Sequence, residues 1–449
     1  MKEKVQAQRD FFQTHQTLEI AYRLQTLKKI EQWIKHNEQL IVQALKEDLH
    51  KDQSESYMCE IGLVLSDIHY QIKHIKQFSK PKRVKTPLSQ FYGKSYEYKE
   101  PYGTVLVMSP WNYPFLLSIQ PTIGAIAAGN TIIIKPSEYA PHVSHIIDKM
   151  IRETCIPEHV CVIEGDVAIS QQLLEERFDY IFFTGSVQVG KIVYEKASHY
   201  LTPVTLELGG KSPCIIDQCQ LKTAAKRVAF GKLLNAGQTC VAPDYLLIQE
   251  NLKEEFVQYY ITYVKEFFPD YKQYVHIINE RHFDRLVKFI NQGHIIYGGT
   301  YDKDSLFIEP TILDQVELSD AIMQEEIFGP ILPIITYQTI DEAIEIIKHY
   351  EKPLALYLFS NNQEIQNKIM KECHFGGGCI NDTIIHLASD ELCFGGVGES
   401  GIGQYHGRYS FETFSHTKSI IKKATWIDLP FRYYPYTRIK EKFIRMFLK

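Results

Sequence analysis

Short apolar runs that alternate with helical patterns constrain the fold of this chain more than any other feature. From residue 104 onward the runs are T-V-L-V-M, T-I-I-I-K, C-V-I-E, Y-I-F-F, V-T-L-E-L, C-I-I-D and Y-L-L-I. Near-continuous apolar strands that are separated by helices are typical of parallel sheets covered on both faces. We therefore predict an α/β protein with a doubly wound sheet.

Three other stretches complete the expected organisation. Residues 4–78 carry apolar side chains at helical spacing, which predicts amphipathic helices. A second α/β pattern covers about 210–383, with E-A-I-E-I-I-K-H as a helix and A-L-Y-L-F as a strand. Residues 81–101 are rich in Pro, Lys and Tyr and fit neither pattern, so we expect a hairpin or an arm there.

Composition limits the function. With 449 residues, 45% of them hydrophobic, and a net charge of −5, the chain is long enough for two or three domains. It has no long basic stripe, which argues against nucleic acid as a partner. The charged N-terminus does not resemble a signal peptide, and no run of 18 apolar residues predicts a membrane span.

The cysteines and histidines indicate a reducing compartment and no metal. Nine cysteines occur without C-x-x-C pairs, which favours the cytoplasm and argues against a disulfide or zinc framework. His386, His406 and His416 are spaced too widely for an obvious metal site. We predict that no metal is bound.

Cys240 is the strongest candidate for a nucleophile. It ends the stretch N-A-G-Q-T-C after a predicted helix, where it could be exposed with backbone N–H groups around its sulfur. A free cysteine is otherwise a small buried hydrophobic residue. Upstream, Glu207 lies between leucines in L-E-L-G-G-K-S-P and is a candidate general base, or else one half of a buried ion pair.

One strand–turn–helix pattern predicts a phosphate site. F-D-Y-I-F-F is followed by Thr184, Gly185 and Ser186 and then by V-Q-V-G-K, which would place a helix N-terminus beside an anion. Gly185 to Lys191 also matches the P-loop pattern G-x-x-x-x-G-K. Ile192 stands where a P-loop has Ser or Thr, but the P-loop stays an alternative.

Two further motifs carry polar candidates. Lys135 ends a predicted strand before Ser137, a candidate helix cap, and Glu138; a solvated lysine is the alternative. Glu138 would accept from ribose hydroxyls and repel a 2′-phosphate, which favours NAD over NADP, whereas the positive charge of Lys135 favours NADP. Asn112 lies between prolines in S-P-W-N-Y-P, where a rigid amide suits an oxyanion hole, or where it forms an Asx turn.

These motifs resemble the aldehyde dehydrogenase superfamily. P-W-N-Y-P, K-P-S-E, F-T-G-S, E-E-I-F-G-P and F-G-G-V-G occur in that family's order over most of the chain. V-A-P-D-Y after Cys240 and S-F-E-T-F-S-H near the end resemble the class 3, fatty-aldehyde branch. One departure is Cys393, where relatives commonly have a proline.

The resemblance implies a domain organisation. It indicates two doubly wound α/β domains, one Rossmann-like for the cofactor and one catalytic, plus a small β bridging domain. The expected ranges are 1–80 and 99–208 for the NAD(P)-binding domain, 209–383 for the catalytic domain, 81–98 and 384–425 for the bridging segments, and 426–449 for a C-terminal tail. The bridging segments imply a homodimer.

The resemblance also implies a reaction. An aldehyde, medium- or long-chain or otherwise lipophilic, would be oxidised to its acid through a thiohemiacetal and a thioester, with NAD as cofactor and NADP also accepted. Cys240 would be the nucleophile and Glu207 the base, while Asn112 and the Cys240 N–H would hold the oxyanion. Alternatives are a CoA-acylating relative and a non-catalytic binding protein on the same fold.

The remaining roles fall to cofactor and substrate. The residues implied for the cofactor are Lys135, Glu138, Gly185, Ser186, Val189, Gly190, Glu326 and Phe328. Trp111, Tyr113 and Phe394 would line the aldehyde tunnel, with ordinary core aromatics as the alternative.

The last residues predict a basic amphipathic helix. Ile439, Phe443, Met446 and Phe447 share one face, and Arg438, Lys442, Arg445 and Lys449 share the other. Such a helix suits a membrane surface. The alternative is docking on the protein's own surface or on a dimer partner.

Overall fold

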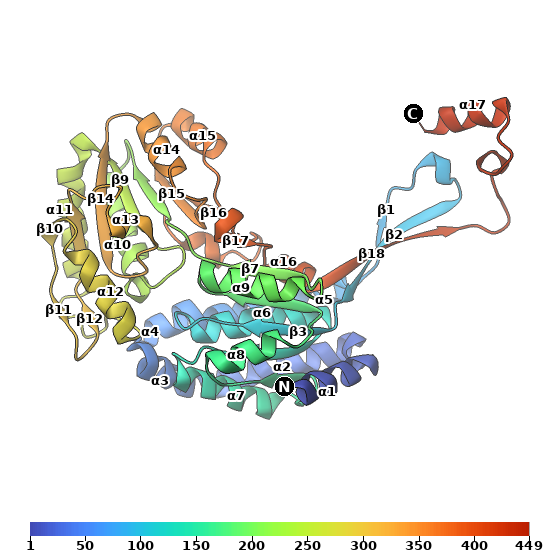
Figure 1. Cartoon of the computed structure of the whole chain (residues 1–449), viewed down its shortest axis with the longest axis horizontal. Helices are drawn as coiled ribbons and strands as arrows, with labels where there is room; N and C mark the ends of the chain where they lie inside the picture. The colour runs from blue at the N-terminus through green and yellow to red at the C-terminus, as the bar shows by residue number, and fades with distance from the viewer. Residues whose placement is uncertain (449) are drawn as a thin grey trace.

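The computed structural model describes residues 1–448 and shows a two-lobed body from which an arm projects (Figure 1). The helices are α1 Lys2–Gln13, α2 Ile20–His36, α3 Glu38–Leu49, α4 Gln53–Ser56, α5 Gly62–Phe78, α6 Pro114–Ala128, α7 Pro141–Thr154, α8 Val167–Leu174, α9 Val187–Ser198, α10 Leu221–Leu233, α11 Lys253–Phe267, α12 Glu280–Ile290, α13 Ala321–Gln324, α14 Ile340–Lys348, α15 Gln363–Glu372, α16 Gly407–Thr413 and α17 Arg438–Phe447. The strands are β1 Lys82–Val84, β2 Gly93–Pro101, β3 Thr104–Met108, β4 Thr131–Lys135, β5 Val160–Val162, β6 Tyr180–Thr184, β7 Val204–Glu207, β8 Pro213–Ile216, β9 Tyr245–Gln249, β10 His294–Tyr297, β11 Tyr301–Asp302, β12 Phe307–Ile308, β13 Thr311–Asp314, β14 Ile331–Tyr337, β15 Ala355–Phe359, β16 Gly377–Ile380, β17 Gly401–Ile402 and β18 Ser415–Lys423.

The first sheet has six strands in the order β17-β7-β6-β3-β4-β5, and all neighbours are parallel except β17 with β7. Every residue of β3, β4 and β6 is buried, which explains their unbroken apolar runs. Val105 and Val107 face a core shared with α2, α5, α6 and α7, whereas Leu106 and Met108 face α1, α8 and α9. The prediction of a doubly wound α/β sheet is confirmed.

The second sheet has seven strands in the order β10-β13-β14-β9-β8-β15-β16, of which only β10 is antiparallel to its neighbour. The helix and the strand predicted from E-A-I-E-I-I-K-H and A-L-Y-L-F are α14 and β15. A separate pair, β11 and β12, follows β10.

The arm is a three-stranded antiparallel sheet in the order β1-β2-β18. Residues 93–101 of β2 pair with residues 415–423 of β18 along their whole length. Within 384–425, only β18 belongs to this sheet, because β17 pairs with β7 and α16 packs on α5 and α6. The arm carries α17 away from the body (Figure 1).

The predicted helix of the tail is present as α17, and the Thr437 hydroxyl caps it by accepting from the Lys440 N–H at 3.4 Å. Phe431 stacks on Phe447 with ring centroids 5.4 Å apart. Lys449, one of the four predicted basic residues, lies outside the described residues. No helix within residues 1–448 has the length and apolar character needed to cross a membrane.

Candidate active site

The nucleophile candidate and the base candidate come from two different sheets. Glu207 is the last residue of β7, at the carboxyl edge of the six-stranded sheet. Cys240 follows the short helical turn Leu234–Gly237, in the connection from α10 to β9 of the seven-stranded sheet. The negative charge of Glu207 raises the pKa of the Cys240 thiol, so the two side chains share one electrostatic environment.

Glu207 is buried and its carboxylate is unpaired. The residue is 2% exposed, and neither Oε1 nor Oε2 accepts a hydrogen bond from the described residues. Burial raises the pKa of this carboxyl well above its usual value because a buried charge loses its hydration. The alternative of a buried ion pair is therefore wrong.

Cys240 is less accessible than its sequence predicts. The thiol is half-buried, and burial raises its pKa above the ordinary value. The negative charges of Glu326 and Glu207 raise the pKa further. The backbone N–H groups of Cys240 and Val241 act in the opposite direction, because they donate to the sulfur and stabilise a thiolate. The expected N–H groups are present, but burial raises the pKa of the thiol more than they lower it.

Asn112 is held beside the Cys240 loop. It lies between β3 and α6, is 3% exposed, and donates from Nδ2 to the Gln238 carbonyl at 3.0 Å. The Asn112 carbonyl accepts from Asn235 Nδ2 at 2.8 Å and from Lys51 Nζ at 3.3 Å. The backbone carbonyl and the side-chain amide of Asn112 are both held in place, and the second Nδ2 hydrogen is free for a further acceptor.

The carboxyl edge of the first sheet offers a dinucleotide site. The chain leaves β3 toward β4 and β5 and then returns to β6 and β7, so the strand order reverses between β3 and β6. Ligands of doubly wound sheets bind at such a reversal. Lys135 ends β4 on one side of it, and α9 begins after β6 on the other.

Lys135 is buried, not solvated. It is 3% exposed, and Nζ donates to the Pro136 carbonyl at 2.7 Å and lies 3.5 Å from Glu138 Oε2. Burial lowers its pKa, while the half-buried Glu138 raises it. The prediction that Ser137 caps a helix is wrong. Its hydroxyl accepts from the Tyr139 N–H at 3.3 Å, and α7 begins only at Pro141.

The turn at Gly185 and Ser186 does not form a P-loop. Ser186 is the N-cap of α9 and accepts from the Val189 N–H at 3.4 Å, so the helix is already formed at Lys191. Lys191 instead pairs with Glu399 at 2.7 Å, and the P-loop alternative is wrong. A Cβ on Gly190 would lie 2.7 Å from Leu208 Cδ2, so this glycine lets α9 pack against the residue after Glu207.

Glu326 lies next to the backbone that follows β7. A Cβ on Gly209 would fall 2.0 Å from Glu326 Oε2, so glycine is needed there to admit the carboxylate. Oε1 is buried without a partner among the described residues, and burial raises the pKa of Glu326 to about 8. Buried polar groups are normally paired, and the ribose hydroxyls of a dinucleotide would supply the missing donors. These residues fit a bound nicotinamide dinucleotide.

The three aromatic residues predicted for the tunnel have different neighbours. The ring of Trp111 packs edge-on against that of Phe328, with centroids 5.4 Å apart, and Phe328 adopts φ of 50°. The Tyr113 hydroxyl lies 2.6 Å from Thr239 Oγ1, beside Cys240. Phe394 stacks on His406 instead, 5.3 Å away, and the adjacent Tyr405 is close enough to Glu207 and Cys240 for both to raise its pKa.

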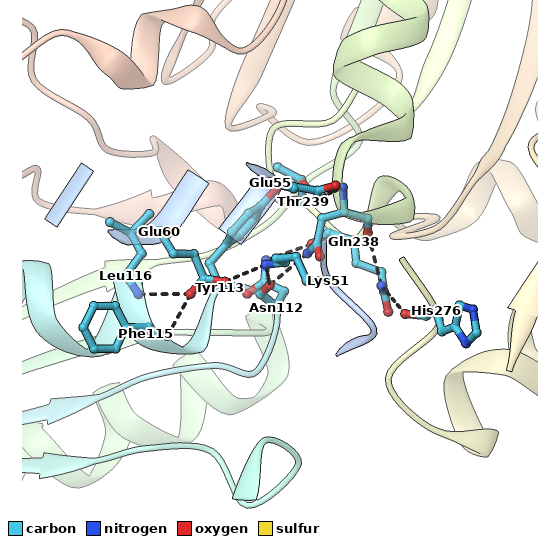
Figure 2. A network of polar contacts seen from close by, with 11 residues as sticks. Lys51, Glu55, Glu60, Asn112, Tyr113, Phe115, Leu116, Gln238, Thr239 and His276 are labelled. Carbon is cyan, nitrogen blue, oxygen red and sulfur yellow. Dashed lines mark hydrogen bonds and ion pairs between the residues drawn. The ribbon is translucent and has the colours of Figure 1, made fainter. Parts of the chain in front are cut away.

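Sequence reasoning missed a group of charged residues behind the site (Figure 2). Lys51 and Glu60 are completely buried and pair at 2.6 Å, and Glu60 also accepts from the Phe115 N–H at 2.9 Å. Glu55 accepts from the Asn235 N–H at 2.8 Å. Charged residues in an amphipathic helical pattern normally predict a solvated face, so nothing in the sequence sets these apart.

The other predicted features have these outcomes. All nine cysteines are free thiols, and Cys393 is exposed. Among residues 1–448, no group of three or more His, Cys, Asp and Glu side chains is placed to hold a metal ion.

Comparisons with known proteins agree on one family. The sequence model described as "Aldehyde dehydrogenase family" matches residues 1–420. The chain is 49% identical to 4,4'-diaponeurosporen-aldehyde dehydrogenase of Staphylococcus aureus, over 100% of this chain and 99% of that protein. It is 44% identical to the dimeric NADP-preferring aldehyde dehydrogenase of Mus musculus, over 93% of each.

A solved structure, described as the substrate-bound state of Staphylococcus aureus AldH, superimposes on the chain with a TM-score of 0.98. The two are 49% identical, and 100% of this chain and 99% of that chain are covered. An NAD-dependent aldehyde dehydrogenase from Sinorhizobium meliloti gives a TM-score of 0.85 at 26% identity, covering 95% and 88% of the two chains.

Proposed function

This chain belongs to the aldehyde dehydrogenase family, and on that premise we propose that it oxidises a lipophilic aldehyde to the carboxylic acid with NAD or NADP. The observation that carries the proposal is the shared site of Cys240 and Glu207, in which the carboxylate is buried without a partner. The relative named 4,4'-diaponeurosporen-aldehyde dehydrogenase supports a lipophilic aldehyde. The NADP-preferring relative supports the use of either cofactor.

The first step is assigned to Cys240 and Asn112. The Cys240 thiolate attacks the carbonyl carbon and forms the C–S bond of a thiohemiacetal, as the π electrons of the C=O bond move to the oxygen. The negative charge that develops on the carbonyl oxygen is stabilised by Asn112 Nδ2–H and the Cys240 N–H, which need no reorganisation because the loop is already fixed. Lys135, Glu138, Glu326 and the N-terminus of α9 would hold the dinucleotide. When bound, its oxidised nicotinamide supplies the hydride acceptor that converts the thiohemiacetal to a thioester.

The last step is assigned to Glu207. Its carboxylate takes a proton from a water molecule, whose oxygen attacks the thioester carbon, and the C–S bond breaks to release the acid and the thiolate. The raised pKa of Glu207 makes it a stronger base than an exposed carboxylate. A CoA-acylating enzyme passes the acyl group to a thiol and has less need of such a base.

One assay separates the alternatives. The protein is incubated with NAD or NADP and with aldehydes from acetaldehyde to long-chain and polyene aldehydes, without CoA. We expect NADH or NADPH to form together with an equal amount of carboxylic acid, with the highest kcat/KM for lipophilic aldehydes. Turnover that requires CoA would establish the acylating alternative, and no reduction with any aldehyde would support a binding protein.

We further propose a homodimer that forms through the arm. β18 is the edge strand of the three-stranded sheet, and Ile420 and Ile421 on it are 40% and 50% exposed. An exposed apolar edge is a template for pairing with a second chain. The relative named as dimeric supports this state. Light scattering should give twice the 52.2 kDa chain mass at micromolar concentration, and a monomer would contradict the proposal.

For the tail we propose contact with a lipid surface. Ile439 on α17, Leu448 directly after it and Trp426 before it are 71%, 72% and 71% exposed, and α17 lies at the end of the arm, away from the body of its own chain (Figure 1). Deletion of residues 437–449 should reduce co-sedimentation with anionic phospholipid vesicles and raise KM for long-chain aldehydes only. Equal binding with and without the tail would contradict membrane contact and leave docking on the partner subunit.

The nine free thiols fit the reducing cytoplasm.

A further inference from the structure

The loop that leads to Cys240 has an unfavourable backbone conformation. Asn235, Ala236 and Gly237 adopt φ values of 53°, 51° and 73°, a left-handed run in which only the last residue is glycine. A Cβ on Gly237 would lie 2.2 Å from the Gly329 carbonyl oxygen, so this turn is also packed tightly against the chain. Non-glycine residues keep such a conformation only when surrounding contacts impose it.

Contacts from three directions impose it (Figure 2). Glu55 Oε1 accepts from the Asn235 N–H at 2.8 Å, and Asn235 Nδ2 donates to the carbonyls of Asn112 and Gln238 at 2.8 and 3.0 Å. Gln238 Nε2 donates to the His276 carbonyl at 3.0 Å. Of these anchors, only Glu55 is an ionisable side chain, and it comes from the short helix α4, far from the loop in sequence.

The same N-terminal segment also holds the other half of the oxyanion site. Lys51, two residues before α4, donates from Nζ to the Asn112 carbonyl at 3.3 Å and pairs with Glu60 at 2.6 Å. Glu60 in turn accepts from the N–H groups of Phe115 and Leu116, which open helix α6 behind Asn112. Residues 51–60 therefore contact both segments that donate to the expected oxyanion.

We infer that Glu55 is a positioning residue for the reaction proposed above: its hydrogen bond to the Asn235 N–H keeps the 235–237 turn left-handed and so sets the Cys240 sulfur and N–H against Asn112. Asn235 is fully buried, so without this acceptor its N–H would lose a partner that water cannot easily replace. The turn would relax, and the sulfur would move relative to the amide. Asn112 and Cys240 would then no longer act on the same carbonyl group, whereas the dinucleotide site at the edge of the first sheet would be unchanged.

Several ionisable groups face Glu55. Lys51 lowers its pKa, while Glu60 and Asp52 raise it, and Cys59, Tyr113 and Tyr274 are close enough for Glu55 to raise theirs. Burial has the largest effect and raises the pKa of Glu55 to about 7. Because either form of a carboxyl group keeps an oxygen that can accept, the bond to Asn235 should survive protonation in a weaker form.

Three variants of the full-length enzyme test the inference. Glu55→Met keeps the bulk of the side chain but has no oxygen acceptor, whereas Glu55→Gln keeps an acceptor and loses only the charge. Asp52→Ala is the matched control, because Asp52 caps the same helix by accepting from the Ser54 N–H at 2.8 Å and does not bond to the 235–237 turn. Each variant is compared at equal concentrations of NAD-binding sites, so that unfolded protein does not contribute.

The first readout is the steady-state rate with hexanal and NAD. We expect Glu55→Met to lower kcat by roughly 10- to 100-fold, as displacements of about 1 Å at a reacting group do, with little change in the NAD dissociation constant. Glu55→Gln should recover most of the lost rate, and Asp52→Ala should resemble the wild type. A Glu55→Met enzyme with the kcat of Asp52→Ala, or equal losses in the Met and Gln variants, would overturn the inference.

The second readout does not depend on aldehyde oxidation. The rate at which iodoacetamide alkylates Cys240, followed by mass spectrometry, should change several-fold in Glu55→Met and stay near the wild-type rate in Glu55→Gln. If the wild type oxidised no aldehyde, the proposed function would fail while this measurement still tested the positioning role. Identical alkylation rates in all four proteins would contradict that role.

Discussion

The loop that presents Cys240 and the strand end that presents Glu207 are built in opposite ways. Around Cys240, the left-handed turn and the adjoining Gln238 are fixed by hydrogen bonds to Glu55, Asn112 and His276, which belong to separate parts of the chain. Glu207 ends a regular strand, and its two carboxylate oxygens have no donors among the described residues. A nucleophile and its oxyanion donors depend on position, whereas a base depends on its pKa, and the two surroundings correspond to these needs.

The largest expected effect comes from removal of the thiol. Cys240→Ala should abolish both NADH formation and the acyl adduct, a loss on the order of 10⁴-fold or more, as is typical when an enzyme loses its nucleophile. Cys219→Ala, which removes a thiol two residues before α10, is the matched control and should keep the wild-type rate. Steady-state NADH absorbance measures both. Substantial turnover by Cys240→Ala would show that the positioned loop does not carry the nucleophile.

A smaller loss is expected at Asn112. Asn112→Ala removes one oxyanion donor, which should lower kcat by about 10²- to 10³-fold. Asn112→Asp should be slower still, because a carboxylate repels the developing negative charge. Rapid-quench measurement of the acylation step gives the relevant rate. If both variants acylate as fast as the wild type, Asn112 anchors the loop without touching the reacting oxygen.

The smallest expected effect is a pH dependence of stability. The pKa of Glu55 is raised from 4.5 to about 7 in the folded protein, so the folded state holds its proton more tightly. This contribution to stability is present in full below pH 4.5 and is lost as pH rises through about 7. It amounts to at most about 3 kcal/mol.

Glutamine at position 55 does not ionise, so Glu55→Gln does not lose stability in this pH range as the wild type does. Its thermal stability relative to the wild type should therefore increase as pH rises. Melting temperatures of the two proteins at about pH 5 and about pH 8 measure the difference. A constant difference between them would show that Glu55 titrates normally and is not held in a strained, buried contact.

The sequence predicts the strand end that presents Glu207, but it does not predict the contacts that support the Cys240 loop. An apolar run predicts the strand that ends at Glu207, and the strand–turn–helix pattern around Gly185 predicts the helix that follows Ser186; both are local signals. The assignment of Cys240 came from motif order, and its exposure was overestimated because burial depends on both lobes.

The support of the Cys240 loop could not be predicted. Glu55 and Asn235 are 180 positions apart, and their contact depends on how the first helices pack against the second lobe. The left-handed conformation of Ala236 has no local signal either, because alanine rarely adopts it. Long-range hydrogen bonds to backbone groups leave no periodicity in the sequence.

We expect Cys240 to form the thioester and Glu207 to be needed only to hydrolyse it. The most direct test is a single-turnover measurement on Glu207→Gln. Mixed rapidly with NAD and a lipophilic aldehyde, this variant should release about one NADH per active site at nearly the wild-type rate, while steady-state turnover falls and an acyl adduct accumulates on Cys240. Glu325→Gln, which changes an exposed carboxylate, should behave as the wild type. A Glu207→Gln enzyme that shows neither burst nor adduct would contradict the account, because Glu207 would then be required before the thioester forms.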